Sequence, residues 1–423
     1  MTMTHPANRT VKILLTLVVA ACFGTLGLSK QFYSEALVDG FFAFALAGVV
    51  ILHLRVRPDW RDALAIVGLT GVLAGIDFGV LHYGQKLAAW LSFAGLSSFM
   101  VMGARAIWSE DREARKMLLY ASVPALLFVA SDYFASTMLE WTSAAHPKTL
   151  DLYLLSFDYS LGVELASIAG RWYAQNSWVH IPSLIVYVGL AIPITVVYAG
   201  RLVRFKEKAL PAMLVFLVTG PIGILFYNLF PACGPHALFQ NGFPFHPFPI
   251  EQASRLLLEP IAVAGPRNAI PSLHMGWALL AWWYSRGLSA AERGLALAFL
   301  VVTTFATLGT GEHWFVDLIV AFPFALMIQG LCSYNLSWKD SQRLGAFAFG
   351  LFATLGWLGM LRYGAKVFWT SPLVPWALAA GMVALTMIRQ MKLDQSAESA
   401  EGQEQQPQKS MSVPAGRVSV SAN

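Results

Sequence analysis

Charged residues are scarce in this chain. Asp, Glu, Lys and Arg make up 13% of its 423 residues, whereas hydrophobic residues make up 57%. A soluble domain carries roughly a quarter charged residues, so this composition excludes an ordinary soluble protein. Cysteine is also rare, and Cys22, Cys233 and Cys332 are too few for a disulfide framework. Because open strands cannot satisfy their backbone groups in lipid, we expect an all-α, polytopic membrane helix bundle.

Twelve apolar runs are long enough to be read as membrane spans. We predict them at residues 12–29, 36–54, 63–83, 88–107, 117–139, 181–200, 212–230, 271–285, 294–311, 314–333, 344–361 and 371–388. Lys and Arg concentrate at the N-terminus and in the loops on its side of the membrane, a bias that marks the cytoplasmic side. The two long connections, 141–180 and 231–270, then lie on the outer side.

The remaining composition narrows the class of protein further. The net charge of +5 is distributed by membrane side, with most Lys and Arg in the cytoplasmic segments. It therefore does not indicate a nucleic-acid partner. The two halves of the chain do not repeat each other, which counts against a duplicated transporter. Residues 392–423 are polar, and we expect them to form a disordered cytoplasmic tail.

Two histidines stand at the mouths of two apolar segments. His274 follows the stretch GPRNAIPSL, and His313 lies in GTGEHWFVDLIVAF, 39 residues further on. A helix of that length covers about 58 Å, close to two crossings of a bilayer core of about 30 Å. One descent and one ascent therefore place both histidines at the outer membrane face, where they can meet.

Asp317 lies four residues after His313, and such a pair shares one face of a helix. A carboxylate there can accept a proton from one imidazole nitrogen and leave the other free to attack. His274, opposite, can donate a proton to a leaving group. The three residues suffice for nucleophilic displacement, and no cofactor or metal is required. Two histidines and one aspartate are also a plausible metal ligand set, which stays as an alternative. A purely interfacial role for the histidines is another.

The residues before His274 favour phosphate as the electrophile. Pro271 suits the first turn of a helix, whose free N–H groups attract an anion. Ser272 adds a hydroxyl group, and Arg267 offers a forked guanidinium to phosphate oxygens.

The two motifs together resemble the type 2 phosphatidic acid phosphatase superfamily. Its second and third signatures, Pro-Ser-x-His and Gly-x-His-x-x-x-Asp, match residues 271–274 and 311–317. The resemblance implies that His313 is the nucleophile, that Asp317 orients it and that His274 is the general acid. It also implies a phosphohistidine intermediate that passes its phosphoryl group to an alcohol or to water. The resemblance covers residues 117–333, a six-span core.

The sequence departs from the broad superfamily pattern in its basic residues. The first signature, a lysine followed by Arg-Pro, is absent, and Ala306 and Thr307 replace the Ser-Arg pair of the third. Both departures, and the stretch from 148 to 162, resemble the inositol phosphorylceramide synthase-like branch, which implies inositolphosphotransferase chemistry. The candidate phosphate ligands that remain are Arg267, Ser272, Asn268 and Lys148, with Arg171 and Arg255 as weaker ones.

These observations lead to one hypothesis and its rivals. We expect accessory helices in 1–116, a catalytic core in 117–333, C-terminal helices in 334–391 and the tail in 392–423. The enzyme is expected to move a phosphoryl or phospho-head group from a lipid phosphate to an alcohol acceptor or water, at the extracytoplasmic side of a bacterial inner membrane. The alternatives are a lipid phosphate or pyrophosphate phosphatase, a non-enzymatic lipid transporter and a non-catalytic lipid-binding relative.

Overall fold

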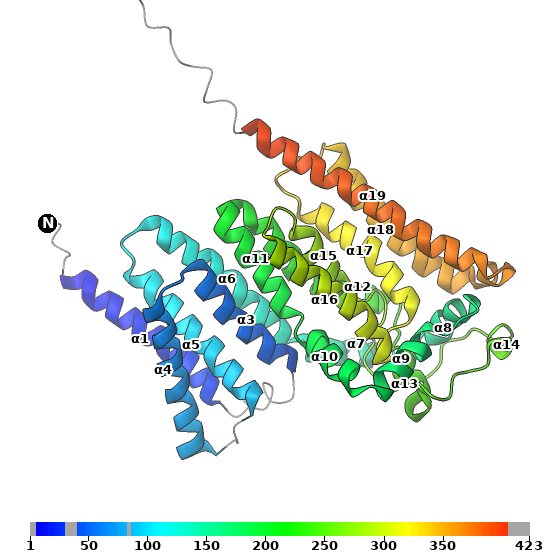
Figure 1. The fold of residues 1–423 in the computed structure, drawn as a ribbon, viewed down its shortest axis with the longest axis horizontal. Coiled ribbons are helices and arrows are strands. Elements are labelled where there is room, and N and C mark those ends of the chain that lie inside the picture. The colour runs from blue at the N-terminus through cyan, green and yellow to red at the C-terminus, as the bar shows by residue number, and fades with distance from the viewer. Residues whose placement is uncertain (1–5, 30–39, 83–85, 405–423) are drawn as a thin grey trace, which may run out of the picture.

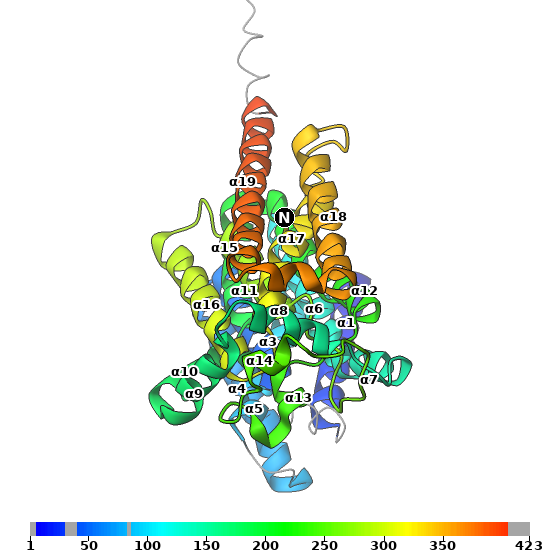
Figure 2. The same ribbon diagram turned by 90° about the vertical axis from the view of Figure 1, so that its right-hand side faces the viewer.

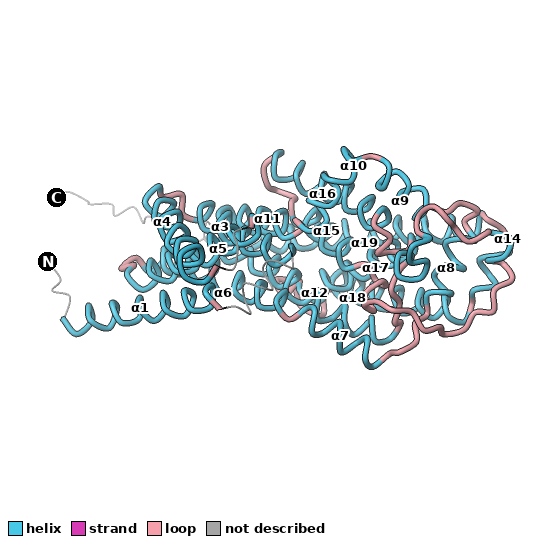
Figure 3. Tube along the Cα trace, turned by 90° about the horizontal axis from the view of Figure 1, so that it is seen from below, coloured by secondary structure: helices cyan, strands magenta, loops and turns pink. Residues whose placement is uncertain are grey.

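The computed structural model describes residues 6–29, 40–82 and 86–404, and helices form most of it. Figure 3 draws only helices and loops along these residues, and the one β-bridge among them pairs Thr149 with Ile261. Nine of the described helices are long and apolar enough to cross a membrane, or up to eleven if each bent pair is one span. The predicted all-α, multi-pass membrane bundle is confirmed.

The N-terminal helices form one end of the molecule (Figure 1). Within this group α3 packs against both α5 and α6, and it also reaches α11 in the centre. The helices are α1 (Pro6–Leu28), α3 (Gly40–Val56), α4 (Trp60–Ile76) with the π-turn η1 (Asp77–Leu81), α5 (Leu87–Trp108) and α6 (Arg112–Tyr133).

The central bundle surrounds α17, which is the most buried of the candidate spans. In its apolar stretch, 83% of the residues are buried. α17 packs against α12 and α15, and α15 packs against α16. The central helices are α11 (Ala191–Phe205), η2 (Lys206–Ala209), α12 (Leu210–Leu229), α15 (Leu273–Tyr284), α16 (Ala290–Gly309) and α17 (Phe315–Cys332).

Capping residues explain where two of the long helices begin. Ser289 precedes α16, where its hydroxyl accepts from the backbone N–H of Glu292 and the Glu292 carboxylate accepts from the N–H of Ser289. This reciprocal capping box satisfies two donors that a helix start otherwise leaves unpaired. Asp340 caps α18 in a similar way, accepting from the N–H groups of Gln342 and Arg343.

Short helices gather at one end of α15, α16 and α17, opposite the end from which α19 projects (Figure 1). They are built largely from the two long connections that the sequence placed on the outer side. These elements are α7 (Ala135–Ala145), α8 (Asp151–Ser160), α9 (Leu165–Gln175), α10 (Ser177–Val188), α13 (Pro235–Phe239), η3 (Gln240–Gly242) and α14 (Ile250–Ala253).

The C-terminal helices α18 (Ser341–Tyr363) and α19 (Leu373–Glu404), joined by η4 (Ala365–Thr370), pack on α17 and rise side by side (Figure 2). The prediction of a disordered tail from residue 392 is wrong as far as Glu404, because α19 continues to that residue. Asp394 in this extension accepts hydrogen bonds from Arg286 and Gln329 of the central bundle, which ties the polar segment down. Residues 405–423 lie outside the described residues.

Three predicted spans differ from the observed helices. Residues 36–39 lie outside the described residues, and the span expected at 36–54 is the 17-residue α3. The span expected at 181–200 is α10 and α11, bent by 53° at a short break. The span expected at 271–285 is the 12-residue α15, which covers about 18 Å. α8 and α9, expected to be an outer connection, are apolar enough to pass as one span broken by 93°.

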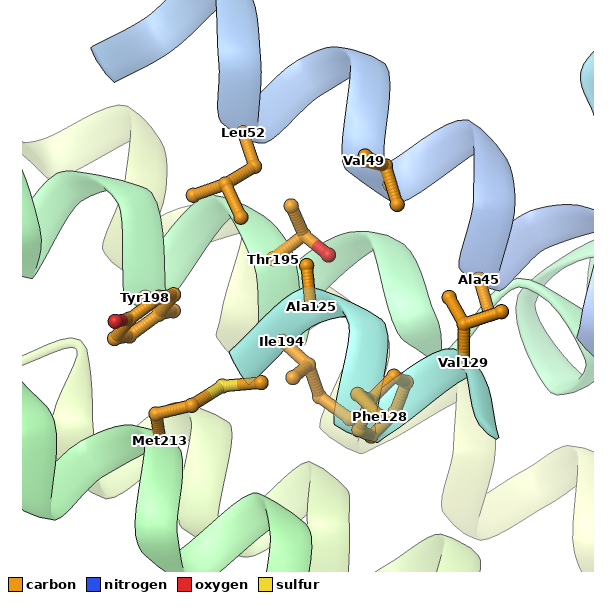
Figure 4. Close-up of a pocket in the computed structure, with 11 residues that line it drawn as sticks. Ala45, Val49, Leu52, Ala125, Phe128, Val129, Ile194, Thr195, Tyr198 and Met213 are labelled. Carbon is orange, nitrogen blue, oxygen red and sulfur yellow. The ribbon is translucent and has the colours of Figure 1, made fainter. Parts of the chain in front are cut away.

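A small apolar cavity marks where the N-terminal helices join the centre (Figure 4). Its walls come from α3, α6, α11 and α12, and Thr195 and Tyr198 carry the two hydroxyl groups among the labelled residues. Gly48 of α3 lies against the Thr195 side chain so closely that an added Cβ would overlap the Thr195 hydroxyl. α3 is therefore packed directly onto the central bundle.

Candidate active site

His274 is the second residue of α15, at the end of the bundle where the short helices gather. The helix begins there because the buried Ser272 hydroxyl accepts from the backbone N–H of Met275, at 3.4 Å. The backbone N–H of Ser272 in turn donates to the carbonyl of Asp317, at 3.2 Å. The two sequence motifs are thus joined through the main chain.

His313 lies in the turn between α16 and α17 and is almost fully buried, with 2% of its surface exposed. Its Nδ1 is 2.8 Å from the carbonyl oxygen of Ala269. A carbonyl only accepts, so Nδ1 carries the proton and donates it, and the Nε2 lone pair is free. The ring is therefore held in the tautomer that a nucleophile needs.

Asp317 lies beside His313 but receives its hydrogen bond from another group. One carboxylate oxygen accepts from the backbone N–H of Trp314 at 2.7 Å and lies 3.5 Å from His313 Nδ1. The sequence predicted that Asp317 would accept the imidazole proton, whereas in the structure the Ala269 carbonyl does so. At that distance the Asp317 carboxyl group is close enough to interact with positive charge on the His313 ring.

The structure brings the His274 and His313 rings together, with 6.3 Å between their centroids and 63° between their planes. A reacting group held between the two rings would lie within reach of both, since reacting atoms approach to about 3–3.5 Å. The catalytic roles of His274, His313 and Asp317 remain predictions. Within the described residues, no group of three His, Cys, Asp or Glu side chains is arranged to hold a metal ion.

Arg267, the first candidate phosphate ligand, is buried and uses its guanidinium on the protein itself. It donates to the carbonyls of His146, Pro147 and Gly265 and contacts the sulfur of Cys233. In this structure Arg267 therefore joins three connecting segments. Burial raises the pKa of the Cys233 thiol to about 12, so this neighbour stays protonated and is no rival nucleophile.

The other candidate phosphate ligands have different surroundings. Ser272 is buried at the start of α15. Asn268 is half-buried beside Ala269, and its side-chain oxygen has no hydrogen-bond partner among the residues that the structure describes. Lys148 is exposed between α7 and α8. Of the weaker candidates, Arg171 is half-buried in α9, and Arg255 is exposed after α14.

Two aspartates in α8 support the site, although neither was predicted to be a site residue. The Asp158 carboxylate accepts from the N–H groups of Phe315 (2.7 Å) and Val316 (3.1 Å), at the start of α17. Asp151 accepts from the N–H groups of residues 233 and 234 and from the Trp314 indole. The two lie seven residues apart on an otherwise apolar helix, a spacing that puts them on one face and is a signal the sequence contains.

Gly234 allows the loop after α12 to approach the turn that carries His313. Its φ of +106° lies in the region that L side chains rarely adopt, and an added Cβ would collide with the Glu312 carbonyl. Asp151 accepts from the N–H of this glycine at 2.9 Å. A side chain at residue 234 would therefore displace the turn and, with it, the His313 ring.

The protonation of His313 gives the first testable prediction. Burial lowers the pKa of His313 to about 4, opposed by the charge of Glu312 and the hydrogen bond to Ala269. The predicted nucleophile needs an unprotonated Nε2, so we expect activity to be retained as the pH falls through 6.5 and to be lost near pH 4. The measurement is kcat/KM against pH with a phosphodiester substrate, whose own charge does not change there. An acid limb near 6.5, the usual histidine pKa, would contradict it.

Comparison with known protein families agrees with the motifs. Residues 152–331 match the family model described as the PAP2 superfamily, and this segment contains both histidines and Asp317. The comparison with curated proteins found no match, and neither did the comparison with solved structures. The match supports the type 2 phosphatidic acid phosphatase superfamily. Members of this superfamily are phosphatases or phosphotransferases, so the match supports an enzyme of this kind, with a lipid phosphate activity in general.

Proposed function

We propose that the protein transfers a phosphoryl or phospho-head group from a membrane lipid to an alcohol acceptor, with His313 as the nucleophile. The observation that carries this proposal is the pair of contacts around His313. Its Nδ1–H is engaged by the Ala269 carbonyl, and the His274 ring faces it at 6.3 Å. One ring thus offers a lone pair, and the other can supply a proton on the opposite side of the same group.

The chemistry proceeds in two displacements. His313 Nε2 forms a bond to phosphorus while the bond to the leaving oxygen breaks, and His274 gives that oxygen a proton. The acceptor hydroxyl then attacks the phosphohistidine, the N–P bond breaks, and His274 takes the acceptor's proton. Asp317, 3.5 Å from Nδ1, stabilises the positive charge of the phosphorylated ring.

An alcohol acceptor is favoured over water by two observations. Both departures from the broad superfamily signatures resemble the inositol phosphorylceramide synthase-like branch. The nucleophile is also almost fully buried, which limits the access of water to a phosphohistidine. Hydrolysis, with water as the acceptor, is the second candidate function and uses the same residues.

The phosphate and the membrane side complete the proposal. Ser272 begins the helix that carries His274, and Asn268 precedes Ala269, the partner of His313, so both are candidates to contact phosphate. Arg267 binds the connecting segments near these residues and adds positive charge. The exposed Lys148 adds a second positive charge at the surface. The distribution of Lys and Arg supports an active site on the extracytoplasmic side, as in a bacterial inner membrane. Residues 117–333 form the catalytic core in this proposal, flanked by accessory helices.

The acceptor is identified by product analysis with purified protein in detergent. Lipid phosphates and phosphodiesters are supplied with and without inositol, ceramide or glycerol-type alcohols, and both free phosphate and new phospholipids are measured. We expect a new phospholipid that requires the alcohol and is absent with His313→Gln. If free phosphate is released at the same rate with and without every alcohol, the protein is a phosphatase and not a transferase. Equal products from wild type and His313→Gln would contradict both.

A further inference from the structure

The His274 ring is held differently from the His313 ring. Within the described residues, no hydrogen bond involves either ring nitrogen of His274, and the side chain is only half-buried. Its neighbours are aromatic. The Tyr187 ring stacks on it with 4.1 Å between centroids and 14° between planes, and the Phe41 ring lies at 5.2 Å.

The two aromatic rings also contact each other, so three rings form one cluster. Phe41 and Tyr187 are 5.5 Å apart in an edge-on arrangement. A ring stacked on the imidazole face fixes its plane but leaves both nitrogens at its edge open. His274 can therefore be oriented without losing the nitrogen that has to exchange a proton with substrate.

The cluster is built from two elements outside the signature motifs. Tyr187 is near the end of α10, just before the 53° bend into α11. Phe41 is the second residue of α3, in the N-terminal accessory helices and outside the matched segment 152–331. α3 is fixed there by its close packing on α11, where Gly48 lies against Thr195. The accessory helices thus reach the reaction centre.

We propose that Tyr187 and Phe41 are positioning residues for His274, and that accessory helix α3 completes the active site. The inference rests on the proposed function, in which His274 is the general acid. Tyr187 keeps the imidazole directed at the leaving oxygen. Phe41 supports the Tyr187 ring from its edge.

The test uses the leaving group to separate positioning of an acid from a general loss of structure. Two phosphodiesters with the same lipid chain are compared, one with an alcohol leaving group and one with a nitrophenol. An alcohol needs a proton to depart, whereas a nitrophenolate does not. kcat/KM is measured for each, since it reports the steps up to the phosphoenzyme. The variants are Tyr187→Leu, Tyr187→Phe and Phe41→Leu, with His274→Gln as the reference.

We expect Tyr187→Leu to lower kcat/KM for the alcohol substrate by about 10- to 100-fold, part of the full contribution of a general acid. For the nitrophenyl substrate, kcat/KM should change by less than about threefold, which also shows that the variant is folded. Tyr187→Phe retains the ring and should behave as wild type, and Phe41→Leu should show a smaller selective loss. Tyr173→Leu is the control, because Tyr173 contacts a histidine outside the proposed mechanism, His180, with 4.4 Å between the ring centroids and 31° between the planes. It should lose no selectivity.

Two outcomes would overturn the inference and are distinguishable. In the first outcome, His274→Gln lowers kcat/KM only for the alcohol substrate, but Tyr187→Leu lowers kcat/KM for both substrates equally or for neither. Tyr187 then does not position the acid, and the proposed function stands. If His274→Gln shows no dependence on the leaving group, His274 is not the general acid and the proposed mechanism fails with it. Equal selectivity losses for Tyr173→Leu and Tyr187→Leu would also contradict a role specific to Tyr187.

Discussion

His313→Gln is expected to lower the rate of phosphoryl transfer by at least about 10⁴-fold, or more than about 5 kcal/mol in transition-state stabilisation. The glutamine amide occupies similar space but has no lone pair able to form an N–P bond. Asp158, Asp317 and the Ala269 carbonyl remain in place, so the loss is chemical. The variant should fold with a melting temperature close to that of the wild type.

The measurement is a single-turnover assay with a radiolabelled lipid phosphate, stopped in base, where phosphohistidine is stable and acid removes it. Wild type should carry label on the protein, and His313→Gln should carry none. His180→Gln is the control, since His180 contacts the Tyr173 ring and is assigned no part in the proposed reaction. A rate within about tenfold of the wild type would exclude His313 as the nucleophile.

His274→Gln is expected to lower kcat/KM about 10²- to 10⁴-fold for a lipid with an alcohol leaving group, the usual contribution of a general acid. The leaving oxygen then departs without the proton that the His274 imidazole would give it. With the nitrophenyl substrate, kcat/KM should stay near the wild-type value, because nitrophenolate needs no proton.

The second displacement gives an independent signature of the same variant. Without His274 to accept the proton of the incoming alcohol or water, the phosphoenzyme should accumulate. A stopped-flow trace with the nitrophenyl substrate should therefore show a burst of one nitrophenolate per enzyme, followed by a slow phase. Equal losses for both substrates, with no burst, would assign His274 a role in binding or folding.

The membrane fold was accessible from composition because its cause is local. Apolar runs long enough to cross a bilayer must be helical there, so their lengths alone predict the bundle. The predicted helix boundaries were wrong where tertiary contacts set the end of a helix. α15 stops at 12 residues, and α19 extends past residue 392 because Asp394 bonds to the central bundle. Neither helix boundary can be read from hydropathy.

The site was accessible in outline for a similar reason. The spacing between His274 and His313 matches two membrane crossings, so the chain order alone predicts that they share a face. The Pro-Ser-x-His and Gly-x-His-x-x-x-Asp motifs then indicate phosphate chemistry. The matched segment 152–331 contains both motifs.

The sequence by itself determined the class of fold, the pair of histidines and the candidate chemistry, because these depend on residue type and spacing along one chain. Only the tertiary structure decided which partner each ring has. Ala269 rather than Asp317 receives the His313 proton, Asp158 reaches α17 from α8, and an accessory helix brings Phe41 to His274. These contacts join residues 44, 157 and 233 positions apart. The physical reason is that hydrogen bonds and ring stacking depend on ångström-scale placement, which the packing of distant helices sets.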